Sequence, residues 1–243
     1  MRWRRLADTV RDAPAKDLNL TAGTAFTFLI SGGTYALVAL TGIVVARKLG
    51  AHDRGVYSIV TTVALLYAAF AELGVSKAGI YLIGRGRYPL RQVAANNLSW
   101  LFLVGGLWAS VMIALGLARS SALPGDLGPQ HFLVFALGGS FLLLLVLVKD
   151  MLIGSGSLLG YNLLEFIEPF LRAVFIVVAV FVLGVGIVGV LFAWLLAVVL
   201  AAVLALRLLA RRASLRPAFS PRLFREQLSF GLRSYLGFVF QAA

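Results

Sequence analysis

The residues best suited to chemistry in this sequence are a few ionisable side chains within long apolar stretches, above all Glu72 and Lys77. A carboxylate inside a membrane span is energetically costly and is therefore a candidate functional group. Two interpretations of Glu72 stay open: it lines a transport cavity, or it is a buried structural partner in a hydrogen bond. Lys77 follows five residues later. That is about 140° around a helix, so we expect each side chain to find its partner on another helix.

Hydroxyl side chains form two further patterns along the chain. Thr27, Ser31 and Thr34 follow one another at spacings of four and three residues, which places them on one face of a helix. We expect this face, and a second stripe of the same kind, to contact protein or water rather than lipid, either as a packing seam or as a cavity wall. The second stripe consists of Ser58, Thr62, Leu65, Ala69, Glu72 and Ser76.

Other charged residues are placed for structural pairing. Glu168 and Arg172 are four residues apart, and we expect an ion pair at the inner end of the fifth span. Lys149 and Asp150 are adjacent and predict a neutralised boundary at the end of the fourth span. With two histidines and no cysteine, the chain has little capacity for a transition-metal site, and we expect neither metal nor cofactor. No hydrolase or phosphate-loop motif is present, so the sequence does not indicate an enzyme.

The elements that must position these residues are membrane-spanning helices. Of the 243 residues, 60% are hydrophobic and only 13% are charged, whereas soluble domains have about a quarter charged. Apolar runs of about 20 residues recur along the whole length, which predicts an all-α membrane protein built as a six-transmembrane-helix bundle. The expected spans are about 20–46, 56–83, 95–118, 131–151, 169–187 and 189–208.

The last two spans are separated by glycines rather than by charge. No charged residue lies between Arg172 and Arg207, and one helix over that interval would be about 50 Å long. Because a hydrocarbon core is about 30 Å thick, we expect the segment GVGIVG (184–189) to form a tight turn. Merging the two spans would also place the basic segment after Arg207 outside, against the positive-inside rule.

Charge distribution sets the orientation. With the amino terminus in the cytoplasm, 16 of the 22 basic residues lie in inner segments and four lie in outer loops. The net charge of +12 is thus explained by orientation in the membrane, and nucleic-acid binding is not expected. The connection ARKLGAHDRGVYS (46–58) then lies outside, against the rule. Either Arg47 and Lys48 extend to the outer headgroups, or the loop has a role at the extracellular mouth.

These expectations divide the chain into four parts. Residues 1–19 form a basic cytoplasmic segment, 20–208 the bundle, 209–232 a basic cytoplasmic loop and 233–243 the start of a seventh helix. The ten residues from Ser234 to Ala243 are too few to cross a membrane, so we expect the full-length protein to continue into a second, C-terminal lobe.

Three segments carry a family resemblance. ARKLGAHDRGVYS, the later AELGVSKAGIYLIGRG (71–86), and the region from GSGSLLGYN (154–162) through the GVGIVG turn are similar to Wzx-type oligosaccharide flippases. These proteins belong to the multidrug/oligosaccharidyl-lipid/polysaccharide (MOP) exporter superfamily, whose members have twelve to fourteen spans. The resemblance covers nearly the whole chain and identifies it with the N-terminal lobe of such a transporter.

The resemblance implies a function and a partner. It implies flipping of an undecaprenyl-diphosphate-linked oligosaccharide across the bacterial cytoplasmic membrane, by alternating access between two six-helix lobes around a cationic cavity, with a proton or sodium ion as possible coupling ion. It places Arg47, Asp53, Arg54 and Tyr57 at an outer gate. The alternatives are a small-molecule or multidrug exporter of the same superfamily and a membrane-embedded polysaccharide-assembly enzyme.

Overall fold

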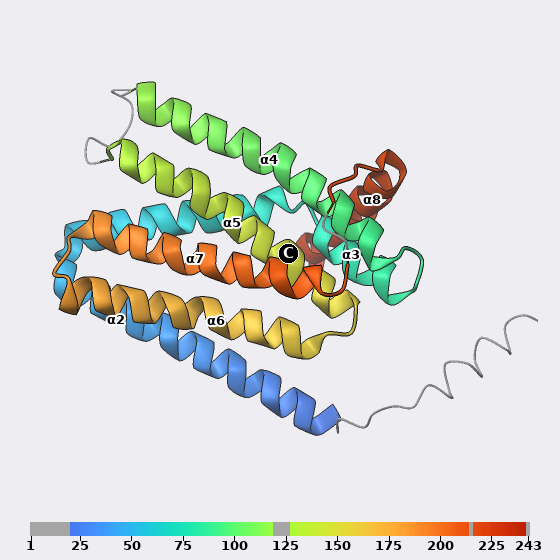
Figure 1. Ribbon diagram of the computed structural model, residues 1–243, viewed down its shortest axis with the longest axis horizontal. Helices are drawn as coiled ribbons and strands as arrows, with labels where there is room; N and C mark the ends of the chain where they lie inside the picture. The colour runs from blue at the N-terminus through green and yellow to red at the C-terminus, as the bar shows by residue number, and fades with distance from the viewer. Residues whose placement is uncertain (1–19, 119–126, 214–215, 242–243) are drawn as a thin grey trace, which may run out of the picture.

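The computed structural model describes residues 20–118, 127–213 and 216–241, and within them the chain is helical, as the sequence predicts (Figure 1). The long helices lie side by side in one bundle, and α5 contacts most of the others. The basic residues 1–19 lie outside the described part. The elements are α2 (Leu20–Ala71), α3 (Val75–Gly84), α4 (Leu90–Ala118), α5 (Pro129–Gly154), α6 (Leu158–Val177), the π-helical segment η1 (Val178–Val182), α7 (Ile187–Ala210) and α8 (Pro221–Gln241).

Helix α2 turns back on itself at Gly50 (Figure 1). Gly50 has φ 81° and ψ 177°, a conformation that glycine adopts without steric cost. Helix continues up to this residue and resumes directly after it, so the expected loop at 46–58 is a one-residue reversal between two helical halves. The prediction of a longer connection was wrong because a single glycine with positive φ is enough to reverse the chain.

The expected span at 56–83 is interrupted in the structure. Helix α2 ends at Ala71 and α3 begins at Val75, with Leu73 at φ 45° and Gly74 at φ 70° between them. A Cβ atom on Gly74 would lie 2.6 Å from the Cα atom of Gly231 on α8. The break therefore fits the backbone of α8 directly against this bend, a contact that no local sequence pattern reveals.

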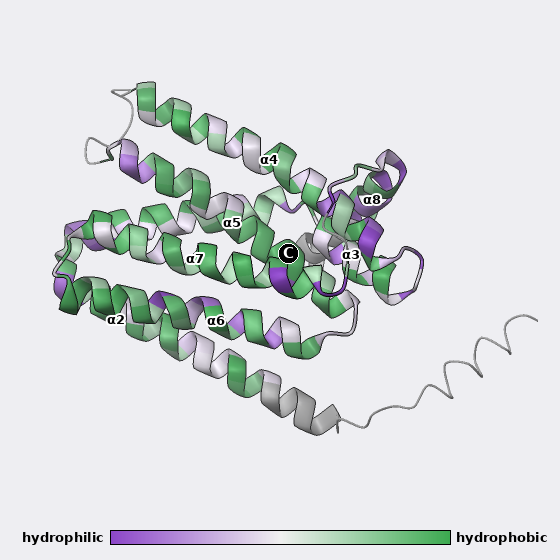
Figure 2. Cartoon of the chain, in the orientation of Figure 1, coloured by the Kyte–Doolittle hydropathy of each residue, from purple (hydrophilic) through white to green (hydrophobic). Residues whose placement is uncertain are grey.

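Four of the described helices, α2, α4, α5 and α7, are long and apolar enough to cross a membrane, and the chain is a multi-pass membrane protein (Figure 2). The count of six spans stays a prediction. Helix α2 counts once but contains two halves around Gly50, and α6, which carries charged residues near its middle, is not among the four. The break expected near residues 184–189 lies between Val182 and Ile187, where Gly184 has φ 60°.

The fifth helix begins earlier than expected. Helix α6 starts at Leu158 rather than near residue 169, so Glu168 and Arg172 lie in the middle of the helix and not at its inner end. The expectation failed because Glu165, Glu168 and Arg172 reduce the hydropathy of this stretch below that of a typical span. These polar positions are tolerated because they face the interior of the bundle, as described below.

Glycine allows close packing at the centre of α5. A Cβ atom on Gly138 would lie 2.6 Å from the ring of Trp194, and one on Gly139 would lie 2.6 Å from Nε1 of Trp108. Tyr67 stacks on Trp108 with ring centroids 4.2 Å apart. The missing side chains thus leave room for two indole rings, and α5 packs tightly against α4 and α7.

Helix α8 docks on α3 and α4 through three buried amides, which we call the amide cluster: Asn96, Asn97 and Gln227. Gln227 accepts a hydrogen bond from Nδ2 of Asn96 at 2.6 Å and donates to Oδ1 of Asn97 at 2.9 Å. It also donates to the carbonyl oxygen of Val75 at 3.3 Å, across the break in the second span. The amide cluster therefore fixes α8 to two separate helices.

Residues 209–232 are not the simple loop that we expected. The segment is helical from Pro221 onward and continues without interruption into the predicted start of helix seven. Glu226 on α8 forms an ion pair with Arg87 in the connection between α3 and α4. A hydrogen bond to Glu226 also raises the pKa of Tyr88 above its ordinary value. The helix forms because its docking face satisfies these polar partners.

Candidate functional site

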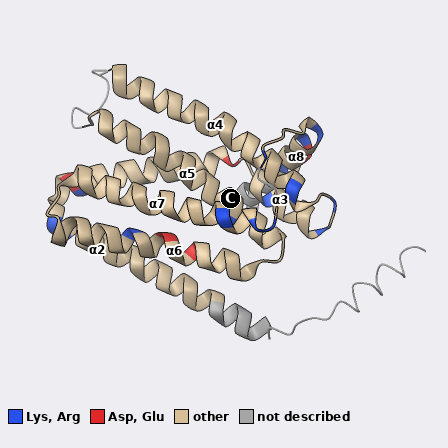
Figure 3. Cartoon of the chain, viewed as in Figure 1, with Lys and Arg blue, Asp and Glu red and all other residues tan. Residues whose placement is uncertain are grey.

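Charged residues inside the bundle are concentrated on one set of helices. Figure 3 shows several of them along α6, whereas α4 and α7 carry charge only near their ends. Because a charge facing lipid is costly, charged residues at this depth are expected to face protein or an aqueous cavity.

The charges of α6 border a cavity of about 390 Å³ between the two halves of α2, α3, α5 and α6. Thr34 and Leu65 line it from the two halves of α2. Three acids and three cations therefore surround a single hollow space in a largely apolar bundle. The ionisable lining residues are Glu72, Lys77, Lys149, Glu165, Glu168 and Arg172.

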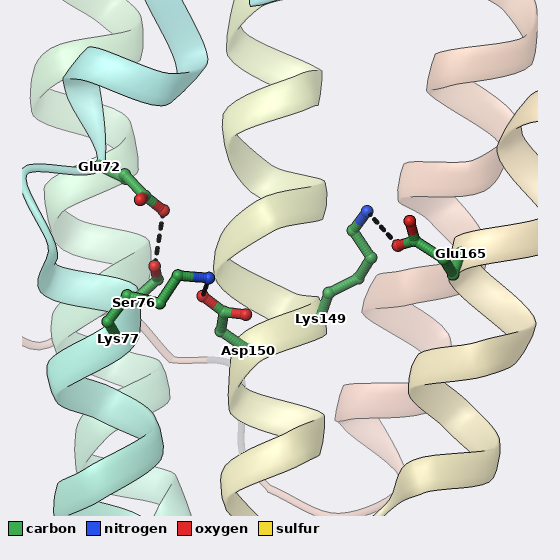
Figure 4. Close-up of polar contacts among 6 residues, drawn as sticks. All are labelled: Glu72, Ser76, Lys77, Lys149, Asp150 and Glu165. Atoms are coloured by element: carbon green, nitrogen blue, oxygen red, sulfur yellow. Dashed lines mark hydrogen bonds and ion pairs between the residues drawn. The ribbon is translucent and has the colours of Figure 1, made fainter. Parts of the chain in front are cut away.

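Two adjacent residues of α5 connect opposite sides of this region (Figure 4). The Nζ atom of Lys149 lies 2.9 Å from Oε2 of Glu165 on α6. Asp150 faces the other way, and its Oδ2 atom lies 2.7 Å from Nζ of Lys77 on α3. The expected neutral boundary is therefore two inter-helix ion pairs, and Lys77 has its partner on another helix, as predicted.

Glu72 is buried at the break between α2 and α3 (Figure 4). Its Oε2 atom accepts a hydrogen bond of 2.6 Å from the hydroxyl of Ser76, one turn further along the chain. Glu72 thus both lines the cavity and takes part in a buried hydrogen bond. The sequence left open whether Glu72 lines a cavity or is a buried hydrogen-bond partner, and in the structure the side chain does both.

The pairing of Glu168 with Arg172 is confirmed, with Oε1 of the acid 3.5 Å from Nε of the arginine. Tyr57 lies beside the Arg172 guanidinium. The structure therefore places Tyr57 inside the bundle next to the ion pair. The reversal of α2 at Gly50, where the resemblance suggested an outer gate, lies about two helical turns away.

The first hydroxyl face contacts α6, as its spacing predicts. Thr27 accepts a hydrogen bond of 3.2 Å from Nδ2 of Asn162, and Thr34 donates one of 3.3 Å to the carbonyl oxygen of Glu165. Ser31 lies between them and is half-buried. These hydroxyls hold the first half of α2 against the helix that carries most of the cavity charges.

The second stripe lines the cavity over part of its length. Leu65, Ala69 and Glu72 line the cavity and Ser76 is buried, whereas Ser58 and Thr62 are exposed and are not part of its lining. The second half of α2 packs on α5 with a different face, which includes Val60 and Ala64.

The hairpin at Gly50 has a contact that the sequence did not reveal. Arg47 and Arg54 are exposed and Asp53 is half-buried. The Nζ atom of Lys48 lies 4.8 Å from the centroid of the Phe181 ring on η1. A cation over an aromatic face is attracted by the ring, so this contact links the hairpin to η1, the segment that follows α6.

Sequence reasoning missed Glu165, which lines the cavity, and Asn162, which bonds to Thr27 on the same side of α6. Together with Glu168 and Arg172 they recur at spacings of three, three and four residues, the periodicity of one helical face. The signal was present in YNLLEFIEPFLR (161–172). It was overlooked because this stretch was placed mostly before the fifth span.

Comparisons with known proteins concern the family and the fold of the chain. The sequence pattern of one protein family, Polysaccharide biosynthesis protein, matches residues 20–240. No curated protein sequence matches the chain at a significant level.

Solved membrane transporters have a similar fold. A MOP superfamily transporter from Pyrococcus furiosus, described as having a binding pocket of reverse polarity, is 21% identical with a TM-score of 0.64, covering 87% of this chain and 50% of that one. An outward-facing MATE family multidrug resistance transporter is 20% identical with a TM-score of 0.67, covering 88% of this chain and 51% of that one. The chain therefore spans about half the length of these transporters.

Proposed function

Because the chain belongs to the polysaccharide biosynthesis protein family, we propose that it forms one lobe of a flippase for lipid-linked glycans. The lobe takes part in moving an undecaprenyl-diphosphate-linked oligosaccharide from the inner to the outer leaflet of the bacterial cytoplasmic membrane. Its role is transport rather than catalysis. The observation that carries the proposal is the cavity, in which three cations and three acids face one space between α2, α3, α5 and α6.

The cations of the cavity suit a diphosphate. Arginine offers forked donors to phosphate oxygens and lysine offers a compact charge. Within the bundle Lys149 is held by Glu165 and Arg172 by Glu168. An incoming diphosphate competes with these carboxylates for the same cations, and a proton or sodium ion bound by a released carboxylate supplies the coupling.

Alternating access requires a second lobe. Repeat-built transporters bind their substrate at the interface of two bundles and rock one against the other. The chain spans about half the length of the transporters it resembles, so the facing wall of the cavity comes from the remainder of the full-length transporter. Bound between the lobes, the glycan headgroup stays away from lipid during its passage.

The proposed orientation has the amino terminus in the cytoplasm. Reporter fusions after Arg87 and after Arg212 are expected to be cytoplasmic, and fusions near His52 and Gly125 external, because inner segments carry most of the basic residues. An external reporter after Arg212 contradicts the six-span arrangement.

Glu72→Gln in the full-length protein tests the function. Glutamine retains an oxygen that accepts the hydrogen bond from Ser76, so we expect normal membrane insertion and abundance. We expect slower translocation of lipid-linked oligosaccharide, measured by restoration of surface glycan in a flippase-deficient cell. Glu226→Gln, an acid on α8 outside the cavity, is the matched control. Unchanged translocation, or loss of the protein itself, contradicts a transport role for Glu72.

A small-molecule exporter of the same superfamily is the second candidate. The specific observation in its favour is that acids balance cations around the cavity, whereas a dedicated site for a diphosphate needs an excess of cations. Resistance to cationic drugs in cells that express the full-length protein, without any change in surface glycan, supports this candidate over the flippase.

A further inference from the structure

An apolar groove of about 510 Å³ lies along α4 and α5, away from the charged cavity. Its small lining residues are Gly105, Gly106 and Ser140. Its large apolar lining residues include Phe102 and Leu137. The side chains of Phe102 and Leu137 are exposed. The groove is therefore open to the surroundings of the bundle, which in a membrane protein are lipid.

A basic pocket of about 540 Å³ adjoins this groove. Arg216 lines the pocket, and the next residue, Pro217, lines the groove. On α4, Ala95 lines the pocket and Leu98, one turn further on, lines the groove. The two hollows thus follow each other along the same helix, with Arg91 and Arg216 at one end and apolar side chains at the other.

The two arginines are available for an anion. Both Arg91 and Arg216 are exposed, and neither forms an ion pair with an acid among the described residues. Other arginines of the chain differ, since Arg87 pairs with Glu226 and Arg172 with Glu168. Two guanidinium groups beside an apolar groove match the chemistry of a lipid phosphate.

The length of the groove selects the kind of lipid. The nine residues from Leu98 to Gly106 extend about 12 Å along α4. This is less than half of a hydrocarbon core of about 30 Å, so the groove stays within one leaflet. It covers the part of one acyl chain nearest the phosphate, whereas a polyprenyl chain would extend far beyond it.

We infer that the groove and the basic pocket together bind one anionic glycerophospholipid of the cytoplasmic leaflet. Its phosphate lies between Arg91 and Arg216, and one acyl chain lies along Gly105 and Gly106. The bound lipid connects α4 to the segment before α8. These are also joined by hydrogen bonds from the amide of Ala218 to the carbonyl oxygen of Ala95 and from the amide of Ser220 to Oδ1 of Asn96. The inference uses the orientation proposed above but not the identity of the transported substrate.

Two variants test the site from its two ends. The double variant Arg91→Gln with Arg216→Gln removes the phosphate contacts. Gly106→Leu fills the groove, and a Cβ atom there meets no other atom within 4 Å, so the helix tolerates the change. The matched controls are Gly42→Leu, at another helical glycine with open space, and Arg225→Gln, at an exposed arginine of α8.

The measurement is retention of lipid by the purified chain after release from bilayers of phosphatidylglycerol or phosphatidylcholine, followed by native mass spectrometry. We expect one retained phosphatidylglycerol and no phosphatidylcholine. At about 1 kcal/mol for each arginine near the surface, the double variant lowers the affinity about 30-fold. Gly106→Leu is expected to abolish retention, and both controls are expected to retain the lipid.

Three results overturn the inference. Equal retention of phosphatidylcholine shows that no anion is selected, and retention by both site variants shows that the lipid is bound elsewhere. Stoichiometric displacement of phosphatidylglycerol by undecaprenyl phosphate assigns the site to the carrier lipid instead. Because the two variants alter opposite ends of the site, either one that folds decides the matter. None of these results depends on translocation of a glycan.

Discussion

Two polar clusters of this protein lie between packed helices, and they differ in the kind of polar group that they contain. The amide cluster of Asn96, Asn97 and Gln227 is entirely buried and made of neutral groups that bond to one another. The ionic seam is made of the charged residues that line the cavity together with Asp150, the partner of Lys77. The lining members are Glu72, Lys77, Lys149, Glu165, Glu168 and Arg172.

The difference follows from the cost of burial. An amide both donates and accepts, so amides pair with one another without any net charge, although Nδ2 of Asn97 has no hydrogen-bond partner among the described residues. A charge has a far larger desolvation cost, and its partner restores only part of it. The amide cluster therefore suits a permanent joint between helices, whereas the ionic seam suits a place where water, ions or substrate exchange. The following predictions test this division, beginning with the largest effect.

Gln227→Leu is expected to cause the largest loss of stability. Gln227 has 0% of its surface exposed, and its amide bonds to Asn96, Asn97 and the carbonyl of Val75. Leucine leaves these groups without a partner, and the expected decrease in the free energy of unfolding is about 3 kcal/mol. The measurement is unfolding in mixed detergent micelles. Ser229→Ala, at an exposed position of the same helix, is the control. A decrease below about 1 kcal/mol means that water replaces the lost partner.

The pair of Lys77 and Asp150 is expected to respond asymmetrically. The side chain of Lys77 is 53% exposed and that of Asp150 is 6% exposed. Lys77→Met leaves a buried carboxylate without its cation, which costs about 2 kcal/mol of the free energy of unfolding. Asp150→Asn leaves a lysine that reaches water, which costs less than about 1 kcal/mol. The same unfolding measurement compares them, and equal losses contradict the burial argument.

Local patterns predicted the features of this fold that depend on neighbouring residues. Apolar runs predicted the helices, glycines predicted the break before α7, and the spacing of Thr27 and Thr34 predicted their common face. The pairing of Glu168 with Arg172 also followed from a separation of four residues. In each case the partners lie on one helix or on one face of it, where helical geometry fixes their relation.

Contacts between distant segments could not be predicted in this way. Gln227 and Asn96 are 131 residues apart in the sequence, and only the folded chain brings them together. The bend at Gly74 likewise depends on Gly231 of α8. The cavity was predicted only in part. Glu72 and Lys77 stood out within an apolar run, whereas Glu165 was overlooked because residues 152–168 lay between two predicted spans.

The last prediction tests whether Lys149 of the ionic seam binds substrate or only forms an ion pair with Glu165. Lys149 and Glu165 are 25% and 31% exposed, so Lys149→Gln is expected to cost only about 1 kcal/mol of the free energy of unfolding. Exchanging the two residues, as Lys149→Glu with Glu165→Lys, restores an ion pair between α5 and α6 and is expected to recover that stability. Translocation of lipid-linked oligosaccharide is expected to stay impaired in the full-length exchanged variant, because a carboxylate then replaces the cation that we propose for the diphosphate. If translocation returns together with stability, the pair is a joint between helices like the amide cluster, and binding in the cavity belongs to Lys77 and Arg172.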